Sequence, residues 1–391
     1  MFRKKITKLA LRIGVLVIVP LLCVEVLMIV LDPYLFKSLF EYDPDIGFRA
    51  RAYYPAAEVT LTNQFGFNDR DYPLRKPSGT FRIVVVGDSF GWAGGLEGNY
   101  TALLETMFER RDGSHKVDVI NTGYPGTHTG EQLVMLKKYA LQYNPDLVVL
   151  GFLAGNDFFE ADANRKRLVV NGCFVDIDKR YEHRFLGYPL ITQSRALVLL
   201  KEKYELHNRT KQASEEARLR VAAGHPAPFR NLPEETFLNI QNAKLEFFNT
   251  KTSAQRFGSN IDYIFQSISE MNDLLKSRNI KFIVAIYPDE MQVSPSQFDT
   301  LVSKFALNRE DYNLNLAQDV LGRFLDSKRI PYVDLLGRFR TEQQKQDLYL
   351  FRNTHWNKAG NELAAEMLFQ YLSKQPYDFN SPQPNPERLF P

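Results

Sequence analysis

Short apolar runs recur along the chain, and each is bounded by glycine, proline or polar residues. The runs are rich in β-branched residues and are typical of strands buried on both faces of a parallel sheet. They cover Arg82–Val86, Lys116–Ile120, Asp146–Phe152, Lys281–Tyr287 and Pro331–Leu335.

Apolar residues between and after these runs recur at helical spacing. Helices are predicted over Tyr100–Arg110, Glu131–Tyr143, Ala196–Val221, Ile261–Ser277, Asn313–Lys328 and Lys358–Ser373. This alternation predicts an α/β domain over residues 81–374, with a mainly parallel five-stranded sheet and right-handed crossovers. Residues 158–257 interrupt the alternation, and their high charge fits either a solvated face or an insertion that forms a cap beside a site.

The amino-terminal apolar pattern is different. Residues 13–31 are almost continuously apolar and are about long enough to span a bilayer as a helix. The segment that follows, Asp32–Phe36, offers no small-residue cleavage site, which favours an uncleaved anchor over a signal peptide. Basic residues in the tail 1–12 and acids after the run predict a cytoplasmic amino terminus. We therefore expect a single-pass inner-membrane protein whose main domain is periplasmic or extracellular.

Glu25 lies near the middle of this predicted anchor. A carboxylate is unfavourable there. Either the side chain is protonated or reaches the outer interface, or it forms a hydrogen bond with another transmembrane helix.

Two further segments flank the predicted domain. Residues 32–80 are rich in aromatic residues and proline, and we expect a linker that packs on the domain with one or two short strands. Within it, Asn63–Asp69 combines turn-forming and aromatic residues. The proline-rich tail 375–391 is expected to be poorly ordered.

Composition narrows the classes of function. A net charge of +3 gives no reason to propose nucleic acid as a partner. The two cysteines, Cys23 and Cys173, form neither a disulfide framework nor a zinc pattern. The sequence also lacks the glycine patterns of dinucleotide and nucleotide sites and the common metal motifs, so we expect no metal and no cofactor.

Polar, glycine-containing turns follow three of the predicted strands. They are Gly87–Ser89, Gly123–Gly126 and Gly155–Asp157. Carboxyl ends of parallel strands meet at one edge of a sheet, where α/β proteins bind ligands. Taken singly, each feature is no more than a turn or a flexible glycine, but together they indicate a site.

A serine at such an edge can act as a nucleophile if a base is near. Ser89 would attack a carbonyl carbon, and His355 would take and return its proton. The backbone amides of Ser89 and Gly126 and the side-chain amide of Asn156 could stabilise the oxyanion.

The chain resembles the SGNH (GDSL-type) serine hydrolases, and in particular the membrane-anchored bacterial type. Four sequence blocks match in order: Gly87–Phe90, Asn121–Gly126, Gly155–Asp157 and the segment around His355. The resemblance implies a flavodoxin-like fold of three layers, Ser89 as nucleophile, His355 as base, and Gly126 and Asn156 in the oxyanion hole. Some relatives with a similar Asp-Thr-His-Trp block act on acetyl groups of exported polysaccharides.

One departure concerns the acid of the triad. The family carries an aspartate three or two residues before the histidine, and these positions are Arg352 and Asn353 here. In a serine triad, replacing the acid by its amide lowers kcat by about 10⁴. Asn353 could still orient His355, an acid such as Asp347 could replace it, or hydrolysis could be lost.

Two functions follow. The first is an extracytoplasmic ester hydrolase or acyl transferase that acts on small acyl esters of glycans or lipids. The alternative is a catalytically weak or inactive SGNH-like domain that binds glycan or serves as an accessory subunit of a membrane complex.

Overall fold

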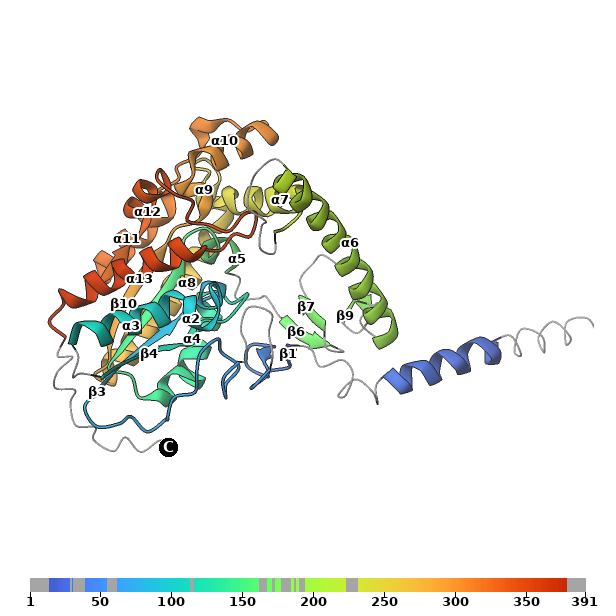
Figure 1. Ribbon diagram of the computed structural model, residues 1–391, viewed down its shortest axis with the longest axis horizontal. Coiled ribbons are helices and arrows are strands. Elements are labelled where there is room, and N and C mark those ends of the chain that lie inside the picture. Colours follow the sequence, from blue (N-terminus) through green and yellow to red (C-terminus); the bar gives the residue numbers. More distant parts are fainter. Residues whose placement is uncertain are drawn as a thin grey trace, which may run out of the picture. The chain divides into compact units, whose positions relative to one another are not determined.

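The computed structural model describes most of the chain (Figure 1). The described residues are 14–28, 30, 39–54, 62–112, 116–161, 167–170, 173–176, 184–185, 188–189, 194–222 and 231–377. The chain divides into two compact units. One comprises Met1–Arg51 and Arg165–Gln212, and the other comprises Ala52–Asn164 and Ala213–Pro391.

A five-stranded parallel sheet forms the centre of the second unit. Its strands are β3 (Thr80–Val86), β4 (Lys116–Asn121), β5 (Leu147–Leu153), β10 (Lys281–Tyr287) and β11 (Tyr332–Asp334). The spatial order is β11-β10-β5-β3-β4, and every neighbouring pair is parallel. This confirms the predicted α/β architecture and sheet. Because the first strand lies between the second and the third, the order is flavodoxin-like, with its topological switch point between β3 and β5.

Helices cover both faces of this sheet. One hydrophobic cluster joins the sheet to α4 (Thr129–Lys138), α8 (Ser253–Ser277) and α11 (Leu316–Lys328). The other joins it to α3 (Tyr100–Asp112) and α13 (Lys358–Ser373). Successive residues of a strand point to opposite faces of the sheet, so each face has its own hydrophobic cluster with helices over it. The unit therefore has three layers: helices, sheet and helices.

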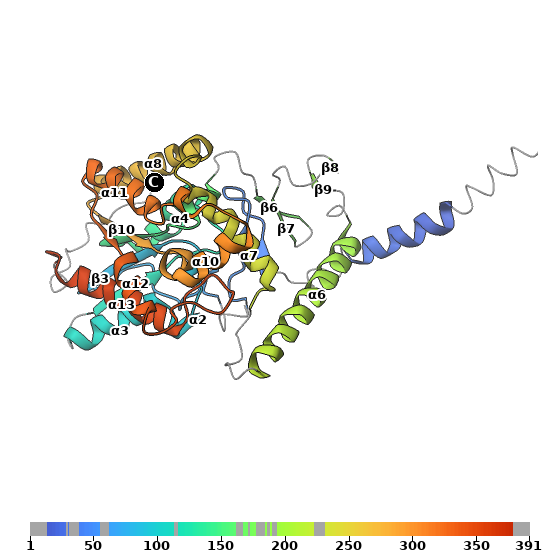
Figure 2. The ribbon, with the colours of Figure 1, turned by 90° about the horizontal axis from the view of Figure 1, so that it is seen from above.

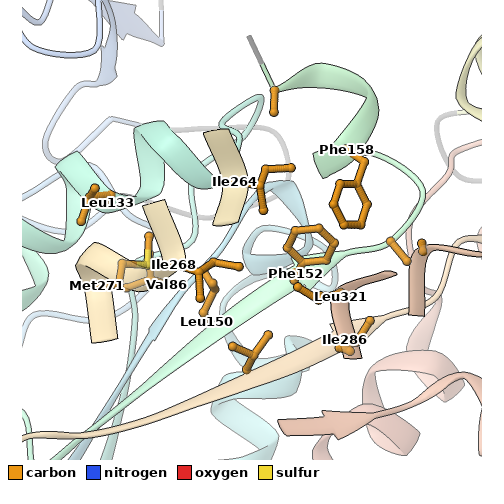
Figure 3. Packing of buried hydrophobic residues seen from close by; sticks show 14 of the residues in the cluster. Val86, Leu133, Leu150, Phe152, Phe158, Ile264, Ile268, Met271, Ile286 and Leu321 are labelled. Atoms are coloured by element: carbon orange, nitrogen blue, oxygen red, sulfur yellow. The ribbon is translucent and has the colours of Figure 1, made fainter. Parts of the chain in front are cut away.

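Figure 3 shows the packing of the first cluster. Val86 and Leu150 lie near Ile268 on α8, and Ile286 on the neighbouring strand lies in the same cluster. All four side chains are fully or almost fully buried. The β-branched and apolar runs therefore form strands because both of their faces are covered.

The predicted element boundaries agree with the structure to different degrees. β10 and α13 have the predicted limits, whereas α8 begins at Ser253 rather than at Ile261. The first turns of α8 are mostly polar, but Phe257 is buried there and packs against Phe247 with ring centroids 5.6 Å apart. The contact of Phe257 with Phe247 thus stabilises helical turns that lie before the periodic apolar pattern in the sequence.

The helix predicted over Glu131–Tyr143 is divided in two. α4 ends at Lys138 and a 3₁₀ turn, η2, covers Ala140–Tyr143. Asn144 then adopts a left-handed conformation with φ of 53°, directly before Pro145. Proline disfavours a helical conformation in the residue before it, so the α-helix gives way to a 3₁₀ turn and ends there.

Part of the predicted insertion 158–257 belongs to the core. α7 (Glu234–Leu245) and the short helix η4 (Glu246–Phe248) bury several aromatic side chains against the sheet-facing helices. Phe247 stacks on Phe158 with ring centroids 4.5 Å apart.

The first unit contains short elements. β1 (Phe40–Glu41) pairs with β2 (Arg49–Ala50), which agrees with the short strands expected within residues 32–80. Two more hairpins, β6 (Arg167–Val170) with β7 (Cys173–Asp176) and β8 (Arg184–Phe185) with β9 (Tyr188–Pro189), precede the long helix α6 (Arg195–Ala222) (Figure 2).

Residues 14–28 form a helix with many exposed apolar side chains. Glu25 on this helix accepts a hydrogen bond from Ser194 Oγ at 2.7 Å and one from the backbone N–H of Ala196 at 3.4 Å, at the start of α6. In the described part of the chain, no helix has both the length and the apolar character that a membrane span requires. The predicted anchor includes residues outside the described ranges, as do the basic tail 1–12 and residues 378–391.

Candidate active site

Ser89 lies just beyond the carboxyl end of β3. It begins the 3₁₀ turn η1 (Ser89–Gly91), which Asp88 caps by accepting a hydrogen bond from the N–H of Phe90 at 3.0 Å. At Gly87, an added Cβ would lie 3.3 Å from the backbone oxygen of Gly151 on β5. Glycine therefore allows β3 and β5 to approach closely at the switch point, two residues before the serine.

His355 lies on a tight loop before α13. The N–H of Leu350 donates to the carbonyl of His355 at 2.8 Å, which closes the loop. Within it, Arg352 and Thr354 adopt left-handed conformations with φ of 49° and 64°. Non-glycine residues in this region are uncommon and are found preferentially at functional sites.

A buried aromatic cluster joins the histidine loop to the serine turn. Trp356 is fully buried, and its ring lies 4.7 Å from that of Phe90 and 5.0 Å from that of Tyr287, between centroids. Phe90 also contacts the imidazole of His355, with centroids 5.2 Å apart. Phe90 follows the serine and Trp356 follows the histidine, so this packing brings the two polar side chains together.

The hydroxyl of Ser89 and the imidazole of His355 are in hydrogen-bond contact, with 2.8 Å between Oγ and Nε2. On the other side of the ring, Nδ1 is 2.9 Å from the side-chain oxygen of Asn353 and 2.9 Å from the backbone oxygen of the same residue. A peptide carbonyl can only accept, so the proton belongs on Nδ1. Nε2 is then left with a lone pair that can accept the serine proton.

Asp347, the alternative acid suggested by the sequence, has another position. Its carboxylate accepts a hydrogen bond from Gln343 Nε2 at 3.2 Å. Among the described residues it makes no hydrogen bond with His355.

The two other predicted oxyanion donors lie at the same edge of the sheet. Gly126, with φ of 75°, belongs to the loop after β4, and the N–H of Tyr124 ties this loop to the carbonyl of Gly87 at 3.0 Å. Asn156 follows β5 and begins α5 (Asp157–Glu160). Within the described ranges, the N–H groups of Ser89 and Gly126 and the side-chain amide of Asn156 donate no hydrogen bond. They are free to bind a negatively charged oxygen.

Two buried carboxyl groups lie behind these turns, and sequence reasoning did not assign them a role. Burial raises the pKa of Asp88 to about 7. Burial and the neighbouring charge of Asp88 raise the pKa of Asp157 well above its usual range. One oxygen of each group has no hydrogen-bond partner in the described structure. Their positions, each within one of the glycine-containing turns, were the available signal.

The last turn of α6, which belongs to the second unit, contacts the histidine loop. The guanidinium of Arg220 lies over the ring of Phe351, 3.9 Å from its centroid. The N–H of Leu232 also donates to the carbonyl of Arg352 at 2.8 Å. Within the described residues, no group of three or more His, Cys, Asp and Glu side chains is arranged to hold a metal ion.

Residues 247–386 match the family model of the SGNH hydrolase-like domain of the acetyltransferase AlgX. The matched range includes the loop of His355 and α13, but not the turn of Ser89. No curated protein matches the sequence of this chain.

Solved structures of SGNH and GDSL hydrolases are similar to this chain at low identity. The acetyl xylan esterase AlAXEase is 14% identical, with a TM-score of 0.40, and the match covers 75% of this chain and 100% of the esterase. A lipase/acylhydrolase from Enterococcus faecalis is 16% identical, with a TM-score of 0.32 and coverage of 75% and 95%. A GDSL-like lipase from Bacteroides thetaiotaomicron is 13% identical, with a TM-score of 0.34 and coverage of 75% and 88%.

The buried carboxyl of Asp88 predicts a pH dependence of stability. Its pKa rises from about 4 in the unfolded chain to about 7 in the folded protein, so folding favours its protonated form. This contribution to stability is complete below about pH 4 and is lost as the pH rises through 7. Asp88→Asn should reduce the loss of unfolding free energy between about pH 5 and about pH 8 by at least about 1 kcal/mol.

Urea denaturation at both pH values measures this difference. Asp262→Asn is the control, because Asp262 is an exposed carboxylate on α8. A pH dependence that is the same in Asp88→Asn and in the unmodified chain would contradict the assignment.

Proposed function

We propose that this chain cleaves acyl esters by way of an acyl-enzyme on Ser89, with His355 as general base and general acid. The observation that carries the proposal is the Oγ–Nε2 contact of 2.8 Å, together with the acceptor oxygens of Asn353 on the far side of the ring. Nucleophile, base and an orienting group within hydrogen-bond reach are the signature of an activated serine.

The reaction follows from this geometry. As the serine oxygen bonds to the acyl carbon, its proton passes to Nε2 of His355, and the carbonyl oxygen becomes negatively charged. The free N–H groups of Ser89 and Gly126 and the amide of Asn156 donate to that oxygen. The carbon–oxygen bond to the alcohol then breaks, and the alcohol leaves with the proton from His355. Water or a second hydroxyl group resolves the acyl-enzyme by the same steps in reverse.

Asn353 replaces the acid without supplying charge. A triad aspartate fixes the histidine tautomer and also stabilises the imidazolium that forms during the reaction. The peptide carbonyl of Asn353 performs the first task, because it can accept only from a protonated Nδ1. The neutral amide performs the second task poorly, so we expect a working but slow esterase.

A small acyl group, with acetyl as the first choice, is the proposed substrate moiety. The match to an acetyltransferase domain supports the acetyl group and makes transfer an alternative to hydrolysis. A hydroxyl of a glycan or lipid is the proposed acceptor. The neutral residue at position 353 favours a second candidate, a catalytically inactive domain that binds glycan or serves as an accessory subunit.

Covalent labelling decides between these candidates. The full chain should react with a fluorophosphonate probe and hydrolyse p-nitrophenyl acetate. Ser89→Ala should abolish labelling and reduce hydrolysis at least about 10³-fold, because the nucleophile is lost. Binding of acetylated oligosaccharide by Ser89→Ala, measured by calorimetry, should persist. If the folded wild-type chain is not labelled, the enzymatic proposal fails and the binding function stands.

Changing the residue beside the imidazole tests the role of Asn353. Asn353→Asp should raise kcat by about 10-fold, because a carboxylate stabilises the imidazolium. The gain should stay well below the factor of about 10⁴ typical of triads, because the carbonyl already sets the tautomer. Asn353→Ala keeps that carbonyl and should lose less than about 10-fold. A fall in kcat for Asn353→Asp would show that the amide has another role.

We also propose that residues 13–31 anchor the chain in the inner membrane, with the amino terminus in the cytoplasm and the second unit outside it. The apolar side chains exposed on the helix of residues 14–28, such as Leu16 at 73%, support this proposal because water is a poor solvent for them. Ser194 is an intramolecular partner for Glu25. A transmembrane partner through Glu25 remains part of the proposal.

Extraction from membranes tests the anchor. The full chain should stay in the membrane fraction after washing with alkaline carbonate. The double variant Leu21→Arg, Leu22→Arg should appear in the soluble fraction, because each arginine near the middle of a span opposes insertion by about 2.5–3.5 kcal/mol. Release of the unmodified chain by carbonate would rule out the anchor.

A further inference from the structure

The turn that carries Ser89 is held by side-chain amides. Asn68 is buried, and its Nδ2 lies 3.1 Å from the carbonyl oxygen of Gly91, 3.4 Å from that of Trp92 and 3.3 Å from that of Gly95. Its own side-chain oxygen has no hydrogen-bond partner among the residues that the structure describes. The residue therefore acts here as a donor, and it comes from the turn-rich segment Asn63–Asp69 that precedes the sheet.

Asn121 extends this contact to the loop of Gly126. Its Nδ2 donates to the carbonyls of Asn68 at 3.0 Å and Gly91 at 2.6 Å. Its Oδ1 accepts from the N–H of Gly123 at 2.9 Å. An added Cβ at Gly91 would lie 2.8 Å from Cα of Gly123, so the two loops are in direct contact.

The turn has backbone hydrogen bonds of its own, such as that from the N–H of Trp92 to the carbonyl of Ser89 at 2.9 Å, and the side-chain amides add further donors. A carbonyl buried without a donor is unfavourable, and side-chain amides satisfy several of them here. Asn99 adds a third amide, which donates to the carbonyls of Phe90 at 2.8 Å and Ala93 at 2.7 Å. Of the three, Asn121 bridges the serine turn and the Gly126 loop, and Asn68 joins this bridge because its backbone carbonyl accepts from Asn121 Nδ2.

We propose that Asn68 is a positioning residue, which sets the distance between the backbone donor of Ser89 and that of Gly126. The inference rests on the proposed function and extends it to a segment outside the four family blocks. An oxyanion hole requires donors at fixed positions, and a displacement of about 1 Å can lower a rate about 10²-fold. Asn68 would thus affect the reaction without touching the substrate.

Asn68→Asp tests this, since it preserves shape but places carboxyl oxygens against three carbonyls. The variant should lower kcat and the rate of fluorophosphonate labelling about 10- to 100-fold, with KM within about 3-fold of wild type. Hydrogen–deuterium exchange of residues 87–98 should accelerate. Both measurements are made well below the unfolding temperature of each variant.

Tyr72→Phe is the matched control. Tyr72 follows this segment within the same linker, residues 32–80, and donates to Glu105 Oε2 at 2.7 Å, away from the serine turn. If the segment had only a structural role, both variants would lower the unfolding temperature and leave kcat unchanged. The control should keep the kcat, the labelling rate and the exchange of residues 87–98 at wild-type values.

The outcomes separate this inference from the proposed function. Wild-type labelling with an unchanged rate in folded Asn68→Asp overturns the positioning role and leaves the esterase intact. Absence of labelling in the wild type overturns the esterase. In that case hydrogen–deuterium exchange is the remaining test of the positioning role. If residues 87–98 exchange at the wild-type rate in Asn68→Asp, the positioning role is overturned.

Discussion

The contact between Phe90 and Trp356 is the interaction on which this site depends. The two rings belong to segments more than two hundred and fifty residues apart, and each is the immediate neighbour of a polar site residue. Hydrophobic burial is non-directional, but two large aromatic rings packed edge to face define a much narrower geometry. The polar contact between Ser89 and His355 is therefore held in place by an apolar one. The aromatic packing thus fixes the position of the hydrogen bond between Ser89 and His355, which by itself contributes only modestly to stability.

Much of the architecture could be predicted because it follows from local pattern. β-branched runs bounded by turns gave the strands, and the parallel topology then required their carboxyl ends to share one edge. The neighbourhood of Ser89 and His355 followed from the same topology and from the family blocks. By contrast, the early start of α8 and the burial of α7 and η4 depend on aromatic contacts between distant segments, which have no periodic signal in the sequence.

The orientation of His355 shows a different limit of sequence reasoning. The sequence displays side chains, so the change from aspartate to Asn353 was visible, whereas the peptide carbonyl beside the imidazole was not. A backbone group has no identity in the sequence, and only the path of the loop determines where it points. The role of Asn68 was hidden for a similar reason, since its partners are carbonyl oxygens of a remote turn. Both cases concern backbone atoms, which carry much of the polar chemistry in this site.

The left-handed conformations of Arg352 and Thr354 have a consequence for how this loop can change. A β-branched residue is unfavourable at a φ of 64°, by roughly 1–3 kcal/mol. Glycine at position 354 would relieve this strain, but it would also widen the range of directions open to the neighbouring peptide group. At position 354, a substitution that relieves backbone strain would therefore also make the loop that orients His355 less rigid. Selection for stability alone would favour such a substitution, and the loop that orients the imidazole of His355 would become more mobile.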